Sequence, residues 1–150
     1  MQDSLLEFEP IELKHLDAIM LIEPEAYPEP WTEAMFRDEI RGNRSYFYVV
    51  NLGPELIGYG GFWLVVDEAH ITSVTIRNDL RGRGYGRCLL AYLLEVAVKV
   101  GAEVATLEVR TSNAVARELY ASMGFRVAGL RKKYYPKSNE DAIIMTKELA

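Results

Sequence analysis

The sequence predicts one α/β (α+β) domain, in which a mixed, mostly antiparallel central sheet of about seven strands is flanked by about four helices. Segments rich in β-branched and aromatic residues alternate with segments whose apolar residues recur every three to four positions. Glycines and prolines separate these segments, with no internal repeat and no linker rich in Ser, Gly or Pro. We therefore treat residues 1–150 as a single domain.

Two helices are predicted before the main sheet. After a short apolar start at residues 5–11, apolar residues recur at helical spacing, and this first helix is expected to stop before Pro24. Residues 27–31 contain two prolines, which predicts a stiff loop. The second helix covers residues 32–41 and is capped by Thr32.

The middle of the chain predicts an antiparallel meander. Residues 45–52 and 56–66 are expected to form a hairpin, to which residues 70–76 add a third strand. The second of these strands contains three glycines, which would weaken it unless it bulges or lies against another backbone.

Helices and strands alternate in the rest of the chain. The predicted elements are, in order, a long helix with periodic apolar residues from Leu89 to Val100, a strand at 104–109, a helix at 113–122, and final strands near 125–132 and 142–148. The succession of strand, helix and strand indicates a right-handed parallel crossover.

Composition excludes several classes of protein. With 49% hydrophobic residues the chain can bury a core, and its longest apolar runs fall short of the ~20 residues that cross a bilayer. We see no signal-peptide pattern, and the single cysteine, Cys88, cannot form an internal disulfide, which fits a reducing compartment. The formal charge of −5 argues against nucleic-acid binding and favours cationic partners. We expect a cytoplasmic protein with neither a membrane nor a nucleic-acid partner.

A turn rich in glycine and arginine lies between the strand at 70–76 and the long helix. Glycine lets the backbone approach a ligand closely, and the first amides of a helix lack internal acceptors and attract anions. The turn therefore predicts a phosphate or pyrophosphate site, although a flexible, solvated turn is the alternative. It matches neither a P-loop nor a dinucleotide fingerprint. Its residues are Arg81, Gly82, Arg83, Gly84, Tyr85, Gly86 and Arg87.

The pattern R-x-x-G-x-G in this turn resembles the acetyl-CoA-binding motif of the GNAT (Gcn5-related) N-acetyltransferases, and the order of elements agrees along nearly the full chain. The resemblance implies a GNAT fold with acetyl-CoA as co-substrate, and we expect no metal. It also implies that backbone amides of residues 82–87 hold the CoA pyrophosphate, and that Val74, Thr75 and Ile76 offer backbone groups to pantetheine. Asn113 is implied to contact the same arm, although as a helix N-cap it would satisfy an unpaired amide.

The segment from Glu108 to Phe125 resembles more specifically the bacterial ribosomal-protein-alanine N-acetyltransferases (RimI type). Taken alone, Glu108 fits solvated strand surface and Tyr120 fits a packed core tyrosine. The resemblance implies catalytic roles instead. An N-terminal amine must lose a proton to attack a thioester, which suits Glu108, and the departing thiolate benefits from a donor such as Tyr120. We expect direct transfer in a ternary complex, because Cys88 is predicted inside the long helix.

The groove that binds the acceptor is expected to be lined by aromatic residues. Tyr27, Trp31, Tyr134 and Tyr135 fall in two regions that, in GNAT enzymes acting on protein N-termini, face each other across the acceptor groove. Ordinary packing of these rings is the alternative. Glu25 is a second candidate base, because its surroundings resemble the acceptor loop of archaeal N-terminal acetyltransferases.

These resemblances predict an enzyme that acetylates the N-terminal α-amine of a protein or peptide. The expected acceptor is the N-terminal alanine of a small-subunit ribosomal protein. Two other functions stay open: acetylation of a small amine such as a polyamine or an aminoglycoside, and a non-catalytic acyl-CoA-binding module. The presence of both Glu108 and Tyr120 speaks against the second of these.

Overall fold

The structure is a computed structural model that describes residues 5–149. Within these residues, seven strands form one sheet. The strands are β1 (Leu6–Pro10), β2 (Ser45–Leu52), β3 (Glu55–Val65), β4 (Glu68–Ile76), β5 (Val104–Arg110), β6 (Arg126–Tyr135) and β7 (Glu140–Glu148). The helices are α1 (Leu16–Ala26), α2 (Glu33–Arg41), α3 (Tyr85–Lys99) and α4 (Ala114–Ser122), with short 3₁₀ turns η2 (Leu13–His15) and η3 (Asn78–Leu80). None of the helices within the described residues is long and apolar enough to cross a membrane.

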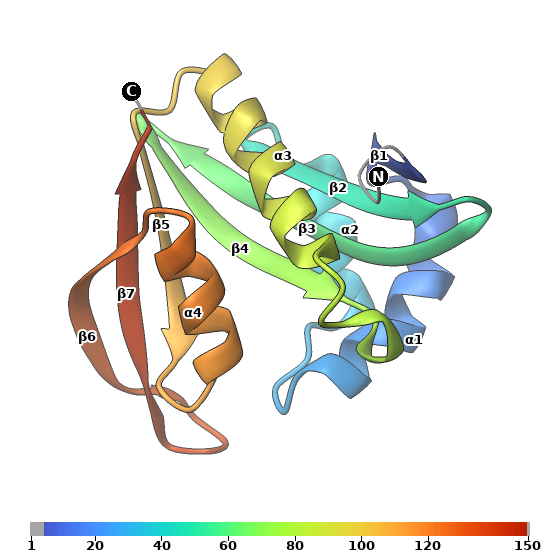
Figure 1. Cartoon of the computed structure of the whole chain (residues 1–150). Helices are drawn as coiled ribbons and strands as arrows, with labels where there is room; N and C mark the ends of the chain where they lie inside the picture. The colour runs from blue at the N-terminus through green and yellow to red at the C-terminus, as the bar shows by residue number, and fades with distance from the viewer. Residues whose placement is uncertain (1–4, 150) are drawn as a thin grey trace.

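The strand order β1-β2-β3-β4-β5-β7-β6 is antiparallel at every pair except β4 and β5, which confirms the predicted mixed sheet. These two strands are parallel, and α3 makes the crossover between them. They pair only from Glu68 opposite Val104 to His70 opposite Thr106. Beyond these residues the two strands diverge, as Figure 1 shows.

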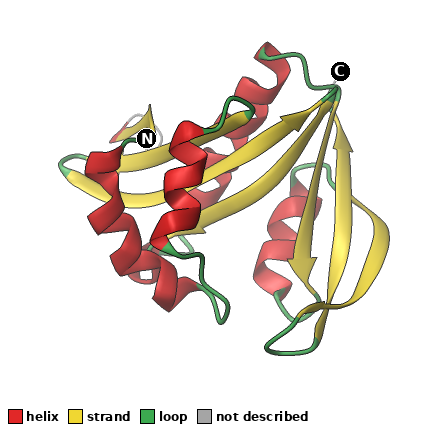
Figure 2. Ribbon diagram, turned by 180° about the vertical axis from the view of Figure 1, so that it is seen from behind, coloured by secondary structure: helices red, strands yellow, loops and turns green. Residues whose placement is uncertain are grey.

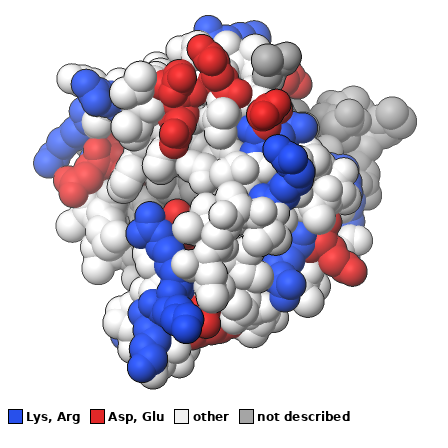
Figure 3. All heavy atoms as spheres, turned by 90° about the vertical axis from the view of Figure 1, so that its left-hand side faces the viewer, with Lys and Arg blue, Asp and Glu red and all other residues white. Residues whose placement is uncertain are grey.

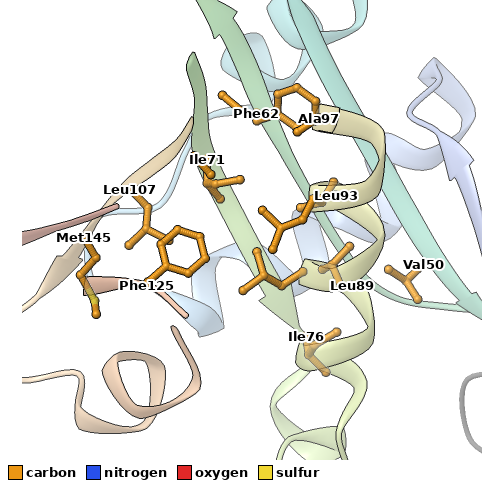
Figure 4. Close-up of a cluster of buried hydrophobic side chains, with 14 of the residues drawn as sticks. Val50, Phe62, Ile71, Ile76, Leu89, Leu93, Ala97, Leu107, Phe125 and Met145 are labelled. Atoms are coloured by element: carbon orange, nitrogen blue, oxygen red, sulfur yellow. The ribbon is translucent and has the colours of Figure 1, made fainter. Parts of the chain in front are cut away.

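Helices cover both faces of the sheet, with α3 and α4 on one face and α1 and α2 on the other (Figures 1 and 2). The larger apolar core lies between α3 and the sheet, where Leu89 and Leu93 are fully buried (Figure 4). A smaller core lies under α1 and α2, around Ile19 and Phe36. Truncating a buried leucine to alanine typically costs about 2–5 kcal/mol. The core therefore holds α3, and with it the glycine-rich turn, firmly against the sheet.

Glycines in β3 let the neighbouring strands approach closely. A Cβ atom on Gly60 would lie 2.6 Å from the Ser73 carbonyl oxygen, and one on Gly61 would lie 2.6 Å from the Tyr46 carbonyl oxygen. The register also shifts between Gly61 and Phe62, which marks a bulge. The strand thus has both features that its glycine content predicted.

The prediction that the first helix stops before Pro24 is wrong, because α1 continues to Ala26. Proline removes only one backbone donor, and the Tyr27 N–H still donates to the Glu23 carbonyl at 3.3 Å, which closes the last turn. The buried side chain of Glu23 also anchors this end of the helix to neighbouring elements. Tertiary contacts therefore override the local effect of proline.

The last hairpin is longer than predicted. Strand β6 runs to Tyr135 and β7 begins at Glu140, whereas the expected strands ended near 132 and began near 142. The register shifts between Arg131 and Tyr135. An irregular section that periodicity does not indicate therefore lies within β6, and the strand continues beyond it.

Candidate active site

A pocket with a volume of about 1430 Å³ opens where β4 and β5 diverge. Its walls come from both strands, the first turn of α3, α4 and the segment after α1. The predicted residues that line it are Tyr27, Trp31, Val74, Ile76, Arg81, Gly82, Gly84, Tyr85, Gly86, Arg87, Glu108, Asn113, Tyr120 and Tyr135. The predicted residues that do not line it are Glu25, Thr75, Arg83 and Tyr134.

The second half of β4 has one edge without a strand partner. Strand β3 pairs with β4 as far as Ile76, whereas β5 pairs with it only as far as His70. Val74 and Ile76 line the pocket along this open edge. An extended ligand with amide groups, such as pantetheine, can supply the hydrogen bonds that the missing strand would have made. The residues present therefore fit the expected co-substrate.

The glycine-rich turn contains two residues with positive φ, Gly82 at 78° and Gly84 at 89°. Glycine adopts such angles without the steric cost that other residues meet. Gly84 is the N-cap of α3, so the first amides of this helix adjoin the pocket and have no acceptor within the helix. This end of α3 suits an anion such as a pyrophosphate.

Two of the three arginines in the turn bind the protein itself. The Nε of Arg81 donates to the Ile76 carbonyl at 3.2 Å, which fastens the turn to β4. The Nη2 of Arg87 donates to the Ser122 hydroxyl at 2.7 Å and links α3 to α4. Arg83 lies outside the pocket lining. The backbone of the turn, more than a cluster of arginines, therefore fits the predicted anion site.

Glu108 lies half-buried on β5 in the pocket wall. Burial raises the pKa of Tyr134 and that of Tyr135, the latter to about 12, and the nearby charge of Glu108 adds to both shifts. Burial also raises the pKa of Tyr120, with further contributions from Tyr27 and Tyr135. These phenols stay protonated at neutral pH and can donate protons or hydrogen bonds. The structure therefore brings the predicted base, the predicted acid and Tyr135 together in one pocket, with Tyr134 near Glu108 but outside the lining.

Two residues serve the fold and the pocket at once. The ring of Tyr120 packs against the core, with its centroid 5.9 Å from that of Phe125, and it also lines the pocket. Asn113 is the N-cap of α4, where its Oδ1 accepts from the Ala116 N–H at 3.2 Å, and it too faces the pocket. The structural and the functional interpretations of these residues are compatible.

Glu23 is a buried carboxylate in the pocket wall that was not predicted from the sequence. It accepts from the Tyr59 hydroxyl at 2.6 Å and from the Trp31 backbone N–H at 2.9 Å, and burial raises its pKa. The Tyr27 hydroxyl lies 2.6 Å from Oγ1 of Thr75. These hydrogen bonds fix the segment after α1 against β3 and β4. Their partners are distant in sequence, so no local pattern indicates them.

Arg110 is a second residue that was not predicted, although strand alternation puts it on the same face as Glu108. Its guanidinium pairs with Glu29, and with Glu140 at 3.4 Å. It also lies 3.8 Å from the centroid of the Tyr135 ring. Hydrogen bonds from Ser112 are the largest cause of a pKa of about 2 at Glu140. Arg110 therefore ties the segment after α1 to the last hairpin.

Glu25 is not brought to the pocket. It is exposed on α1, and its backbone carbonyl accepts from Asn78 Nδ2 at 3.2 Å. Residues two apart on a helix point about 200° away from each other, so Glu23 faces the pocket where Glu25 does not. Among residues 5–149, no group of three or more His, Cys, Asp or Glu side chains is arranged to hold a metal ion.

Comparison with known families identifies this architecture. The model of the acetyltransferase (GNAT) family matches residues 16–125. The chain therefore belongs to this family and is an acetyl-CoA-dependent N-acetyltransferase. The family and the fold class predicted from the sequence are thereby confirmed.

Individual proteins and solved structures also match over most of this chain. A [ribosomal protein bS18]-alanine N-acetyltransferase of Escherichia coli K12 is 36% identical over 137 residues, covering 90% of this chain and 92% of the relative. An uncharacterized N-acetyltransferase of Methanocaldococcus jannaschii is 34% identical over 136 residues, covering 90% and 86%. The crystal structure of the Escherichia coli ribosomal-protein-S18-alanine N-acetyltransferase matches with a TM-score of 0.88 at 33% identity, over 97% of this chain and 94% of that one. Ard1 from Thermoplasma volcanium shares the fold, with a TM-score of 0.91 at 22% identity over 97% and 99%.

Proposed function

We propose that the chain transfers the acetyl group of acetyl-CoA to the N-terminal α-amine of a protein, and that its acceptor is the N-terminal alanine of ribosomal protein bS18. One observation carries the chemistry: Glu108 and Tyr120 line a single pocket, together with the open edge of β4 and the anion-binding turn. The acceptor is supported by the relative with that stated substrate at 36% identity. A ribosomal acceptor of this kind would place the reaction in the cytoplasm.

Glu108 is the proposed base. A protein α-amine has a pKa of about 8, so most of it is protonated at neutral pH and must lose a proton before it attacks. Glu108 accepts this proton, directly or through one water, as the new C–N bond forms and the C–S bond of the thioester breaks. General base catalysis of this kind contributes about 10²–10⁴-fold to the rate.

Tyr120 is the proposed acid. Its hydroxyl is protonated at neutral pH and donates this proton to the sulfur as the thiolate departs. Exchange with solvent returns both side chains to their starting states. Cys88 is the only thiol of the chain and does not line the pocket, so we propose direct transfer between two bound substrates without an acyl-enzyme.

The acceptor binds on the face of the sheet that carries α1 and α2. Tyr27, Trp31 and Tyr135 line the pocket there, and contacts with Glu23 and Arg110 hold the segments that carry them. Side chains fixed before binding lose little freedom when a peptide arrives. The net charge of −5 also attracts a basic protein N-terminus over long range.

Release of CoA from acetyl-CoA, measured with the purified protein, tests this proposal. A peptide with the N-terminal sequence of bS18 is the expected acceptor, and the same peptide with a blocked α-amine should release no CoA. A higher kcat/KM with spermidine or an aminoglycoside would replace the proposal by a small-amine acetyltransferase. Binding of acetyl-CoA without turnover of any acceptor would indicate a binding module.

A further inference from the structure

Strand β6 contains an irregular section opposite Asp141. The register shifts between Arg131 and Tyr135, so that three residues of β6 face the single residue Asp141 on β7. In this section Lys133 has a φ of 52°, the left-handed region that a lysine enters only at a cost. The Lys133 N–H donates to Oδ1 of Asp141 at 2.8 Å. The Asp141 side chain therefore holds a backbone conformation that lysine itself does not favour.

The bulge changes the direction of Tyr134. Successive side chains of a regular strand point to opposite faces of the sheet, which would separate Tyr134 from Tyr135. Their ring centroids instead lie 5.0 Å apart with the planes at 85°, in an edge-to-face contact. Both phenols also lie close enough to Glu108 for its charge to add to the effect of burial on their pKa. Bulges beside active sites commonly redirect a side chain in this way.

The two tyrosines are held differently. The Tyr135 ring lies 3.8 Å from the Arg110 guanidinium and lines the pocket. Tyr134 is 42% exposed, and the Arg131 guanidinium lies 5.5 Å from its ring centroid. With less packing around it, Tyr134 depends on the backbone of the bulge for its position.

We propose that Asp141 is a positioning residue for the peptide acceptor. Its carboxylate fixes the bulge at Lys133, and the bulge turns Tyr134 toward Glu108. Tyr134 itself lies outside the pocket lining and extends, toward the incoming peptide, the wall that Tyr135 forms. Two adjacent phenol donors suit the backbone carbonyls of a peptide more than they suit a small amine. This role rests on the proposed function, in which the acceptor is a protein N-terminus.

Protection of the sheet edge is a simpler explanation of the same bulge. Strand β6 is the outermost strand, and bulges and cations at an edge discourage pairing with other chains. It carries Arg126, Arg131, Lys132 and Lys133, and Figure 3 shows Lys and Arg groups on the side of the molecule where this edge lies. Edge protection requires no particular position of Tyr134. The two explanations therefore predict different kinetics.

Steady-state kinetics of Asp141 variants separate the explanations. Asp141→Ala removes the acceptor of the Lys133 N–H. We expect the peptide KM to rise about fivefold, which corresponds to the loss of one hydrogen bond, while the acetyl-CoA KM stays unchanged. Asp141→Asn keeps an acceptor oxygen and should stay within about twofold of the wild type. Adding Lys133→Gly to Asp141→Ala should restore the peptide KM, because glycine adopts positive φ freely. Asp38→Ala, exposed on α2, is the matched control.

An NMR titration of isotope-labelled tyrosines reports the position of Tyr134 without any acceptor. The Tyr134 signal, assigned with Tyr134→Phe, should titrate at lower pH in Asp141→Ala than in the wild type, because the ring leaves Glu108 for solvent. An unchanged peptide KM in Asp141→Ala would overturn the proposal, whatever the titration shows. Failure of the wild type to acetylate any peptide would overturn the proposed function itself, so the two failures are distinguishable.

Discussion

The guanidinium carbon of Arg110 lies 3.8 Å from the centroid of the Tyr135 ring. The same guanidinium pairs with Glu29, after α1, and with Glu140, at the start of β7. One side chain of β5 thus joins the two segments that border the proposed acceptor site. The side chains of Arg110 and Glu29 are only 13% and 16% exposed, so water shields this ion pair less than it shields a surface pair.

Arg110→Lys should weaken acceptor binding selectively. Lysine keeps the charge but lacks the planar fork that serves two carboxylates and stacks on a ring. We expect the peptide KM to rise about tenfold, equivalent to about 1.4 kcal/mol, with no change in the acetyl-CoA KM. Kinetics with each substrate varied in turn measure this, and Arg37→Lys, in an exposed pair with Glu33 on α2, is the control. A rise in the acetyl-CoA KM alone would show that Arg110 serves the binding of acetyl-CoA and not that of the acceptor.

Glu108→Gln should lower kcat by about 10²–10⁴-fold, because the amide cannot take a proton from the attacking amine. Calorimetric titration with acetyl-CoA should show nearly unchanged affinity, since the co-substrate is expected at the open edge of β4 and the turn before α3. Glu25→Gln is the matched control, because Glu25 is exposed outside the pocket. If Glu108→Gln retained normal turnover, the base would have to be sought elsewhere, with Glu23 as the next candidate in the pocket wall.

Gly86→Val should weaken acetyl-CoA binding without unfolding the protein. A Cβ atom on Gly86 would meet Leu119 at 3.7 Å and Ile76 at 3.9 Å, which are ordinary contacts, so a Cβ atom fits here without displacing its neighbours. The added valine would occupy the anion site at the start of α3 and should raise the Kd for acetyl-CoA about tenfold or more. Gly129→Val, outside the pocket, is the control, because a Cβ atom there would lie 3.5 Å from Ile144, also an ordinary contact. Unchanged affinity in Gly86→Val would show that the turn does not bind the pyrophosphate.

Glu140 should make a pH-dependent contribution to the free energy of unfolding. Hydrogen bonds lower its pKa from 4.5 to about 2, those from Ser112 being the largest cause. A carboxyl group whose pKa is lower in the folded state stabilises that state above its unfolded pKa, and this contribution disappears as the pH falls through the folded pKa. The difference in unfolding free energy between the wild type and Glu140→Gln should therefore be largest near neutral pH and shrink between pH 4.5 and about 2. Urea unfolding across this range measures it, and a constant difference would refute the assignment.

Features with a local cause were predictable from the sequence. The spacing of Leu89 and Leu93 indicated α3, and the glycines of the turn indicated a site for positive φ at Gly84. Asn113 was recognised as a cap because an N-cap depends on a residue only three positions away. The candidate catalytic pair lies within one short strand, turn and helix, so a single motif contains it.

Features that depend on distant partners were not predictable. Glu23 binds a tyrosine 36 positions away, and Arg110 binds Glu29 across 81 positions. Hydrophobic periodicity records which face of an element is buried, but not which polar group meets it there. The continuation of α1 through Pro24 depends on such a contact as well, because the hydrogen bond from Tyr59 holds Glu23 at this end of the helix.

Tandem mass spectrometry of the acetylated acceptor tests the central claim most directly. A peptide with the N-terminal sequence of bS18, incubated with acetyl-CoA and the wild-type protein, should gain one acetyl group on the α-amine of its first alanine. Its lysine side chains should stay unmodified, and Glu108→Gln should leave the whole peptide unmodified over the same time. Acetylation confined to lysine side chains, or an equal yield with Glu108→Gln, would contradict the proposed reaction.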